Sequence, residues 1–140
     1  MIREYKKDDL EQILEIWINE NISAHSFINK EYWIDNYKFV KQELPKSNVY
    51  VYEINNKIIG FIGLNNKYIE GIFVKNKMQS QGIGKELIKK AKQINKELEL
   101  NVYEKNIRAI RFYEKQGFII TKRFIDKETD QFQYTMEWKL

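Results

Sequence analysis

A glycine-containing segment in the middle of the chain has the residue types of an anion-binding loop. It lies between a strand-like and a helix-like pattern and reads Gln79-Ser80-Gln81-Gly82-Ile83-Gly84-Lys85. Glycine lets a backbone approach a ligand closely, and unpaired N–H groups at a helix N-terminus bind anions. The sequence therefore predicts a phosphate or pyrophosphate site here, and a simple glycine turn is the alternative interpretation.

Two widespread phosphate loops do not match this segment. A Walker-type loop requires Gly at position 79 and Ser or Thr after Lys85, where the chain has Gln79 and Glu86. A dinucleotide-binding fingerprint requires a third Gly at position 87, which is Leu87. The segment is therefore typical of neither a P-loop NTPase nor a dinucleotide-binding domain.

A second segment, residues 106–118, supplies the context that the loop alone lacks. It contains, at fixed spacing, Asn106, Ala109, Phe112, Tyr113, Gly117 and Phe118. Together with Gln79, Gly82 and Gly84, it makes the whole chain resemble the GCN5-related N-acetyltransferases, whose motifs are Q/R-x-x-G-x-G/A and N-x-x-A-x-x-F-Y-x-x-x-G-F. The residues His25-Ser26-Phe27-Ile28 and Tyr32-Trp33 also resemble a subgroup of small bacterial members that includes peptidyl-lysine N-acetyltransferases.

The hydrophobic pattern predicts elements in the order β-α-α-β-β-β-α-β-α-β-β. Helical spacing begins at Leu10 and gives way to a loop over 21–29, before a second helix over 30–43. From residue 48 to 74 a period of two predicts three antiparallel strands. After a polar loop, the pattern predicts a helix from 83 to 94, a strand over 98–103, a short helix over 107–116 and a hairpin of 118–125 with 131–138.

These elements predict one α/β (α+β) domain over residues 1–140. The resemblance implies a mixed sheet of six to seven strands with about four helices, in which strands 68–74 and 98–103 run parallel and splay apart. It also implies acetyl-coenzyme A as co-substrate, with pantetheine along the first of these strands and pyrophosphate on the glycine loop. The implied cofactor contacts are Ile72, Phe73, Val74, residues 79–85, Asn106 and Phe112. Asn106 is equally a favoured helix N-cap.

The absence of cysteine bears on the chemistry. No acyl-cysteine intermediate can form, so direct attack of an amine on the thioester in a ternary complex is the simplest route. A lysine amine has a pKa of ~10.4 and is almost fully protonated at neutral pH, so a base or a base-held water must remove a proton. Glu70, on strand 68–74, is the candidate base. Its alternative role is to face solvent or attract a cationic substrate.

The resemblance assigns the remaining catalytic tasks. Tyr113 matches the family's general acid, which would protonate the leaving thiolate, and a packing tyrosine is the alternative. Backbone N–H groups of Phe73 or Val74 would polarise the thioester carbonyl. The acceptor amine would enter near residues 21–34, where His25, Phe27 and Trp33 are candidate substrate contacts. His25 also has a purely structural interpretation as a loop or capping residue.

Composition excludes several other classes of protein. The N-terminus is too polar for a signal peptide, and no apolar run reaches the ~20 residues of a membrane span. We therefore expect a cytoplasmic protein, without a metal, acting as a monomer or homodimer. The net charge of +4 suits an anionic ligand but gathers in no patch that would indicate nucleic-acid binding. Two functional alternatives stay open, namely toxin-like acetylation of aminoacyl-tRNA and a CoA-binding sensor without catalysis.

Overall fold

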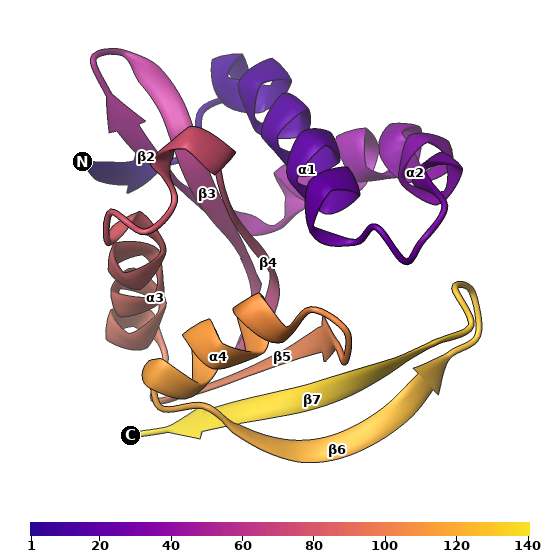
Figure 1. Ribbon diagram of the computed structural model, residues 1–140. Coiled ribbons are helices and arrows are strands. Elements are labelled where there is room, and N and C mark those ends of the chain that lie inside the picture. The colour runs from indigo at the N-terminus through magenta and orange to yellow at the C-terminus, as the bar shows by residue number, and fades with distance from the viewer.

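Seven strands form one mixed sheet, and the computed structural model describes all residues 1–140 (Figure 1). The strands are β1 (Ile2–Glu4), β2 (Asn48–Ile54), β3 (Lys57–Asn65), β4 (Tyr68–Val74), β5 (Glu97–Tyr103), β6 (Ile119–Asp126) and β7 (Gln131–Lys139). They lie in the order β1-β2-β3-β4-β5-β7-β6, and every neighbouring pair is antiparallel except β4–β5. The predicted mixed sheet with one parallel pair is confirmed.

Four α-helices cover the two faces of this sheet. They are α1 (Leu10–Ala24), α2 (Lys30–Glu43), α3 (Ile83–Ile94) and α4 (Ile107–Lys115), and three single-turn 3₁₀ helices lie at η1 (Lys7–Asp9), η2 (Leu44–Lys46) and η3 (Asn76–Met78). The helices α1 and α2 pack on one face, and α3 and α4 pack on the other (Figure 1). None of the helices has the length and apolar character that a membrane span requires.

Asparagines with left-handed backbone angles occupy both tight turns of the meander. Asn55 and Asn56, between β2 and β3, have φ angles of 51° and 64°, which is the left-handed conformation that a type I′ turn demands at both positions. Asn66, between β3 and β4, has a φ of 55°. Asparagine tolerates this region better than other residues with a side chain, so tight turns form at Asn55-Asn56 and at Asn66-Lys67.

One predicted boundary is wrong. The segment 21–24, expected to belong to a loop, is the last turn of α1. Asn21 is buried there, and its side-chain Nδ2 donates to the carbonyl oxygen of Trp17 at 2.9 Å, one helical turn earlier. A polar residue that bonds back to its own helix does not interrupt it, and this outcome is invisible in a hydrophobic pattern.

Candidate active site

The parallel strands β4 and β5 separate almost as soon as they meet. Their only paired residues are Tyr68 and Glu99, near the start of each strand. Beyond this point the strands diverge toward Val74 and Tyr103, and the edge of β4 that faces β5 has no strand partner. The splayed pair that the resemblance implied is therefore present, and it leaves free backbone groups along one edge of β4.

The pairing of β4 with β3 decides which backbone groups face this cleft. The N–H of Lys75 donates to the carbonyl oxygen of Ile59 at 2.9 Å, and hydrogen-bonded pairs alternate along an antiparallel ladder. Phe73 is two residues away and therefore also bonds toward β3. The backbone groups of Ile72 and Val74 point the other way, into the cleft.

The glycine loop lies just past the end of β4 and opens onto α3. Gly82 is the N-cap of α3 with a left-handed φ of 82°, and the first intrahelical bond runs from the N–H of Glu86 to the oxygen of Gly82 at 3.0 Å. The N–H groups of residues 82–85 are therefore left without intrahelical partners. Arg108, from α4, adds a guanidinium whose Nη2 lies 3.4 Å from the hydroxyl of Ser80.

Gln79 fixes the loop to its surroundings instead of facing an anion. Its side-chain Nε2 donates to the carbonyl oxygen of Val74 and to Oε1 of Glu20, both at 3.0 Å. Glu20, on α1, also accepts the N–H of Asn76 at 3.1 Å through its other oxygen. Burial raises the pKa of Glu20 despite these bonds. The first residue of the loop motif thus ties β4, the loop and α1 together.

The two sequence motifs meet at Gly84. A Cβ added to Gly84 would lie 3.1 Å from the ring of Phe112, which is closer than nine in ten real Cβ contacts. The glycine therefore allows α4 to pack directly on the first turn of α3. This contact explains in physical terms why the loop and the segment 106–118 occur together.

Tyr113 lies one residue further along α4, in the core between the sheet and α3. It is only 8% exposed, and its hydroxyl has no hydrogen-bond partner in the protein. Burial, with a smaller contribution from the neighbouring Tyr68, raises the pKa of Tyr113 well above its ordinary value. Because Tyr68 marks the point where β4 and β5 diverge, the unpaired phenol of Tyr113 lies close to the origin of the cleft.

Glu70 occupies an irregular position on β4. Gly71 pairs with Gly63 and Ile69 with Leu64, so Glu70 is the extra residue of a β-bulge. Its carboxylate accepts a hydrogen bond from the hydroxyl of Ser47, which follows η2. Glu70 is therefore exposed on the face of the sheet that α1 and α2 cover.

The three predicted acceptor contacts share one aromatic cluster between α1, α2 and the end of β5. The ring of His25 stacks on Trp33 with centroids 5.1 Å apart. The rings of Phe27 and Tyr103 meet it in T-shaped arrangements, with centroids 5.7 Å and 5.1 Å from that of His25. His25 and Trp33 are both buried, and the indole N–H of Trp33 has no partner. Asn106 caps α4 by accepting the N–H of Ala109, as predicted.

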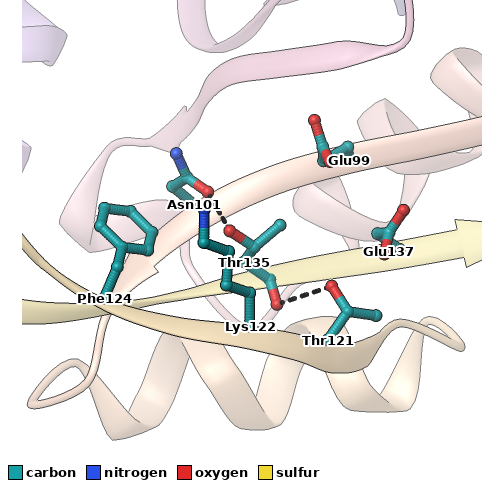
Figure 2. Close-up of a pocket in the computed structure, with 7 residues that line it drawn as sticks. All are labelled: Glu99, Asn101, Thr121, Lys122, Phe124, Thr135 and Glu137. Atoms are coloured by element: carbon teal, nitrogen blue, oxygen red, sulfur yellow. Dashed lines mark hydrogen bonds between the residues drawn. The ribbon is translucent and has the colours of Figure 1, made fainter.

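A hollow of ≈ 550 Å³ opens on the same face, where no helix covers β5, β6 and β7 (Figure 2). Its lining residues are Glu99, Asn101, Thr121, Lys122, Phe124, Thr135 and Glu137. Glu99 and Glu137 lie directly opposite each other on β5 and β7, although like charges in that position weaken strand pairing. The hollow adjoins the cleft because Glu99 is also the partner of Tyr68.

Sequence reasoning missed several residues around the cleft. Glu20, Tyr68, Ser47 and Arg108 were not candidates, although Arg108 stands inside the second motif, two residues after Asn106. No local pattern singles out Glu20, which is one of several polar residues on α1. In addition, no group of three or more His, Cys, Asp or Glu residues could hold a metal ion.

The chain matches known proteins over most of its length. The model of the acetyltransferase (GNAT) family matches residues 10–118. The peptidyl-lysine N-acetyltransferase YiaC of Escherichia coli is 35% identical, with 99% of this chain and 96% of YiaC covered, and YjaB of E. coli is 29% identical, with 87% and 84% covered.

Solved structures give the same picture. The solution structure of apo YjaB from E. coli superposes with a TM-score of 0.87 at 26% identity, covering 99% of this chain and 96% of YjaB. The PaiA N-acetyltransferase of Thermoplasma acidophilum, solved with coenzyme A, has a TM-score of 0.86 at 23% identity, covering 100% and 98%, and supports the fold. The splayed strands, the glycine loop and these matches together show that the chain belongs to the acetyltransferase (GNAT) family of N-acetyltransferases.

Proposed function

We propose that this enzyme transfers the acetyl group of acetyl-coenzyme A directly to the side-chain amine of a protein lysine. The observation that carries the proposal is the hydroxyl of the buried Tyr113, which makes no hydrogen bond within the protein and lies beside the cleft between β4 and β5. A second observation, the free N–H groups of residues 82–85 at the end of the same cleft, supports a pyrophosphate-containing co-substrate. The relatives YiaC and YjaB are named as peptidyl-lysine N-acetyltransferases, which supports lysine as the acceptor.

The cofactor would lie along β4 and end on the glycine loop. Residues 82–85 would hold the pyrophosphate with backbone N–H groups at a helix N-terminus, and Arg108 would add a charge-assisted hydrogen bond. The backbone N–H groups of Ile72 and Val74 would bind the pantetheine, because they face the cleft, whereas the carbonyl oxygen of Val74 already accepts a hydrogen bond from Gln79. The register thus favours Val74 over Phe73 as the amide that polarises the thioester carbonyl, and it adds Ile72 as a second donor.

Tyr113 would donate its proton to the departing thiolate. A phenol whose pKa is raised by burial stays protonated throughout the physiological range, which a general acid requires. Since its hydroxyl has no protein partner, it is free to bond to sulfur. Tyr113 therefore has the protonation state and the freedom that this step needs.

Glu70 would accept the proton of the incoming ammonium, directly or through water. Its position on a bulge turns its carboxylate toward the α1/α2 face, which borders the open hollow. The hydroxyl of Ser47 donates to Glu70 and would hold the carboxylate in place. The carboxylates of Glu99 and Glu137 would attract the cationic side chain before it loses its proton.

The direct test is acetyl-CoA turnover with a panel of amines. Free CoA is followed with a thiol reagent, which the cysteine-free enzyme does not consume. The panel contains lysine peptides, the same peptides with lysine replaced by arginine, peptides with a free N-terminus, polyamines and aminoacyl-tRNA. Release that depends on lysine, with acetyl-lysine found by mass spectrometry, supports the proposal. CoA release that depends only on another acceptor would overturn the assignment of lysine as the acceptor. Tight acetyl-CoA binding without CoA release would favour a CoA-binding sensor.

A further inference from the structure

Helix α1 spans the open end of the cleft and contacts both diverging strands. On the side of β4, Glu20 accepts hydrogen bonds from Asn76 and Gln79, at 3.1 Å and 3.0 Å. On the side of β5, His25 follows the last turn of α1 and lies against Tyr103 and Asn106. Since β4 and β5 pair only at Tyr68–Glu99, these contacts bridge the strands where the sheet itself does not.

The hydrogen bonds of His25 define its tautomer. Nδ1 lies 2.9 Å from the carbonyl oxygen of Asn21, which can only accept, so Nδ1 carries the proton. Asn106 uses its Oδ1 to accept the N–H of Ala109 at 3.3 Å, which leaves its Nδ2 facing His25. That Nδ2 lies 3.3 Å from Nε2 and donates to it. When the imidazole is neutral, each of these three hydrogen bonds therefore has one donor and one acceptor.

The surroundings of the ring favour the neutral form. His25 is 9% exposed, stacks on Trp33 and meets the edges of Phe27 and Tyr103. Three titratable groups contact this aromatic cluster. The hydroxyl of Tyr103 donates to Asp126, the hydroxyl of Tyr32 donates to Glu128, and the Nζ of Lys105 lies 5.6 Å from the centroid of the Phe27 ring. None of them forms an ion pair with the imidazole, and burial lowers the pKa of His25.

We propose that His25 is a positioning residue, which as the neutral Nδ1–H imidazole holds Asn106 and thereby fixes the first turn of α4 against α1. The role rests on the proposed acetyl transfer, because α4 carries both Arg108 and Tyr113. A proton on Nε2 would place two donors face to face. Asn106 would then have to release His25 or turn its amide over and uncap α4.

Two substitutions of His25 separate the two hydrogen bonds. His25→Gln places an acceptor where Nε2 lies and retains the bond from Asn106, whereas His25→Asn retains only the bond to Asn21. Both lose the same aromatic stacking, so they form a matched pair. We expect His25→Asn to lower kcat about fivefold to tenfold relative to His25→Gln, with similar melting temperatures, since a lost buried hydrogen bond is worth ~1 kcal/mol. Equal kcat values for the two variants would overturn the proposal.

Nuclear magnetic resonance tests the same proposal without any turnover. Because His25 is the only histidine, its ring nitrogens give one unambiguous set of signals. We expect the Nδ1–H tautomer at pH 7, a titration below the ordinary histidine range, and faster amide exchange at Ala109 in His25→Asn than in His25→Gln. An Nε2–H tautomer, or equal exchange in the two variants, would overturn the positioning role. If wild type turned over no amine at all, the proposed function would fail while these signals still decided the role of His25.

Discussion

The two faces of the sheet hold their helices by different means. On one face, α3 buries the aliphatic residues Ile83, Leu87, Ile88 and Ala91 in a core whose buried members are mostly aliphatic. On the other face, α1 packs beside an aromatic cluster and is also attached by polar side chains along its length. The carboxylate of Asp9 binds Arg3, Gln12 accepts the N–H of Ile58 at 3.0 Å, and Glu20 and His25 bridge the cleft.

This difference corresponds to the proposed functional role of each face. The α3/α4 face has to present a fixed anion-binding loop and a fixed phenol, and dense aliphatic packing supplies that rigidity. The α1/α2 face has to border a cleft that admits an acceptor, so its helices are held by directional contacts around an opening. Stability should therefore depend mainly on the first face, and acceptor use mainly on the second.

The largest expected effect is on stability, and it is tested by comparing a substitution on each face of the sheet. Leu87→Ala removes a fully buried side chain from the aliphatic core and should lower the free energy of unfolding by about 2–5 kcal/mol. Trp33→Phe also reduces a buried side chain, but it removes an indole N–H that has no partner, so its cost should be about 1 kcal/mol or less. Urea unfolding of both variants measures the difference. A larger loss for Trp33→Phe would contradict the assignment of stability to the α3/α4 face.

The next effect depends on pH and concerns the attachment of α1. Arg3 binds both oxygens of Asp9, at 2.8 Å and 2.9 Å, and this hydrogen-bonded pairing lowers the pKa of Asp9. The folded state therefore holds a proton on Asp9 less readily than the unfolded state. Its stabilisation is fully present above the unfolded pKa of ~3.9 and is lost as pH falls through the folded value.

Asp9→Asn should remove this contribution. We expect it to lower the free energy of unfolding at pH 7 by about 1.5–3 kcal/mol, the usual worth of hydrogen bonds to a charged group. The difference between wild type and variant should shrink steadily below about pH 4. Unfolding curves from pH 2.5 to 7 test this, and a constant difference over that range would show that Asp9 acts through packing alone.

A smaller effect is expected at the anion-binding loop. Gly82 has a φ of 82°, and a Cβ there would meet nothing within 4 Å, so only backbone strain opposes a side chain. Gly82→Ala should carry about 1–2 kcal/mol of left-handed strain, seen as up to a roughly tenfold higher KM for acetyl-CoA as the loop relaxes. Gly82→Asn is the matched control, because asparagine tolerates this conformation and should recover most of the affinity. Equal KM values for the two variants would argue against a strained loop.

The smallest effect concerns the open hollow of the α1/α2 face. Glu99→Gln and Glu137→Gln should each raise the KM for a lysine peptide about twofold to threefold, because an exposed charge pair is worth ~0.5 kcal/mol. The KM for acetyl-CoA should not change, and added salt should diminish the effect. Glu15→Gln, exposed on the far side of α1, is the matched control. An equal rise in the control would show that only net charge matters.

The sequence predicted the α3/α4 face better than the α1/α2 face. Apolar spacing and the glycine motifs located α3, α4 and Tyr113, because burial and left-handed turns leave local signals in a chain. The roles of Glu20, His25 and Asn106 depend on partners that lie 59 residues (Glu20 and Gln79) or 81 residues (His25 and Asn106) apart in the chain, and no local pattern encodes such pairs. The sequence did not predict that α1 continues through Asn21, because a polar residue in a hydrophobic pattern indicates a loop. Only the structure shows that the Asn21 side chain is buried and bonds to the carbonyl oxygen of Trp17.

The central claim is that Tyr113 serves the chemistry and not only the core, and one comparison tests it most directly. Tyr113→Phe and Tyr50→Phe each remove a single hydroxyl from the same core cluster. Tyr113 lies at the cleft, and Tyr50 lies away from it. The affinity for acetyl-CoA is measured by calorimetry, and kcat is measured with the best lysine peptide as acceptor. We expect Tyr113→Phe to bind acetyl-CoA within about twofold of wild type while kcat falls about 10²-fold, as loss of a general acid does, and Tyr50→Phe to change neither. Equal kcat values for the two variants would contradict the account, because Tyr113 would then only pack.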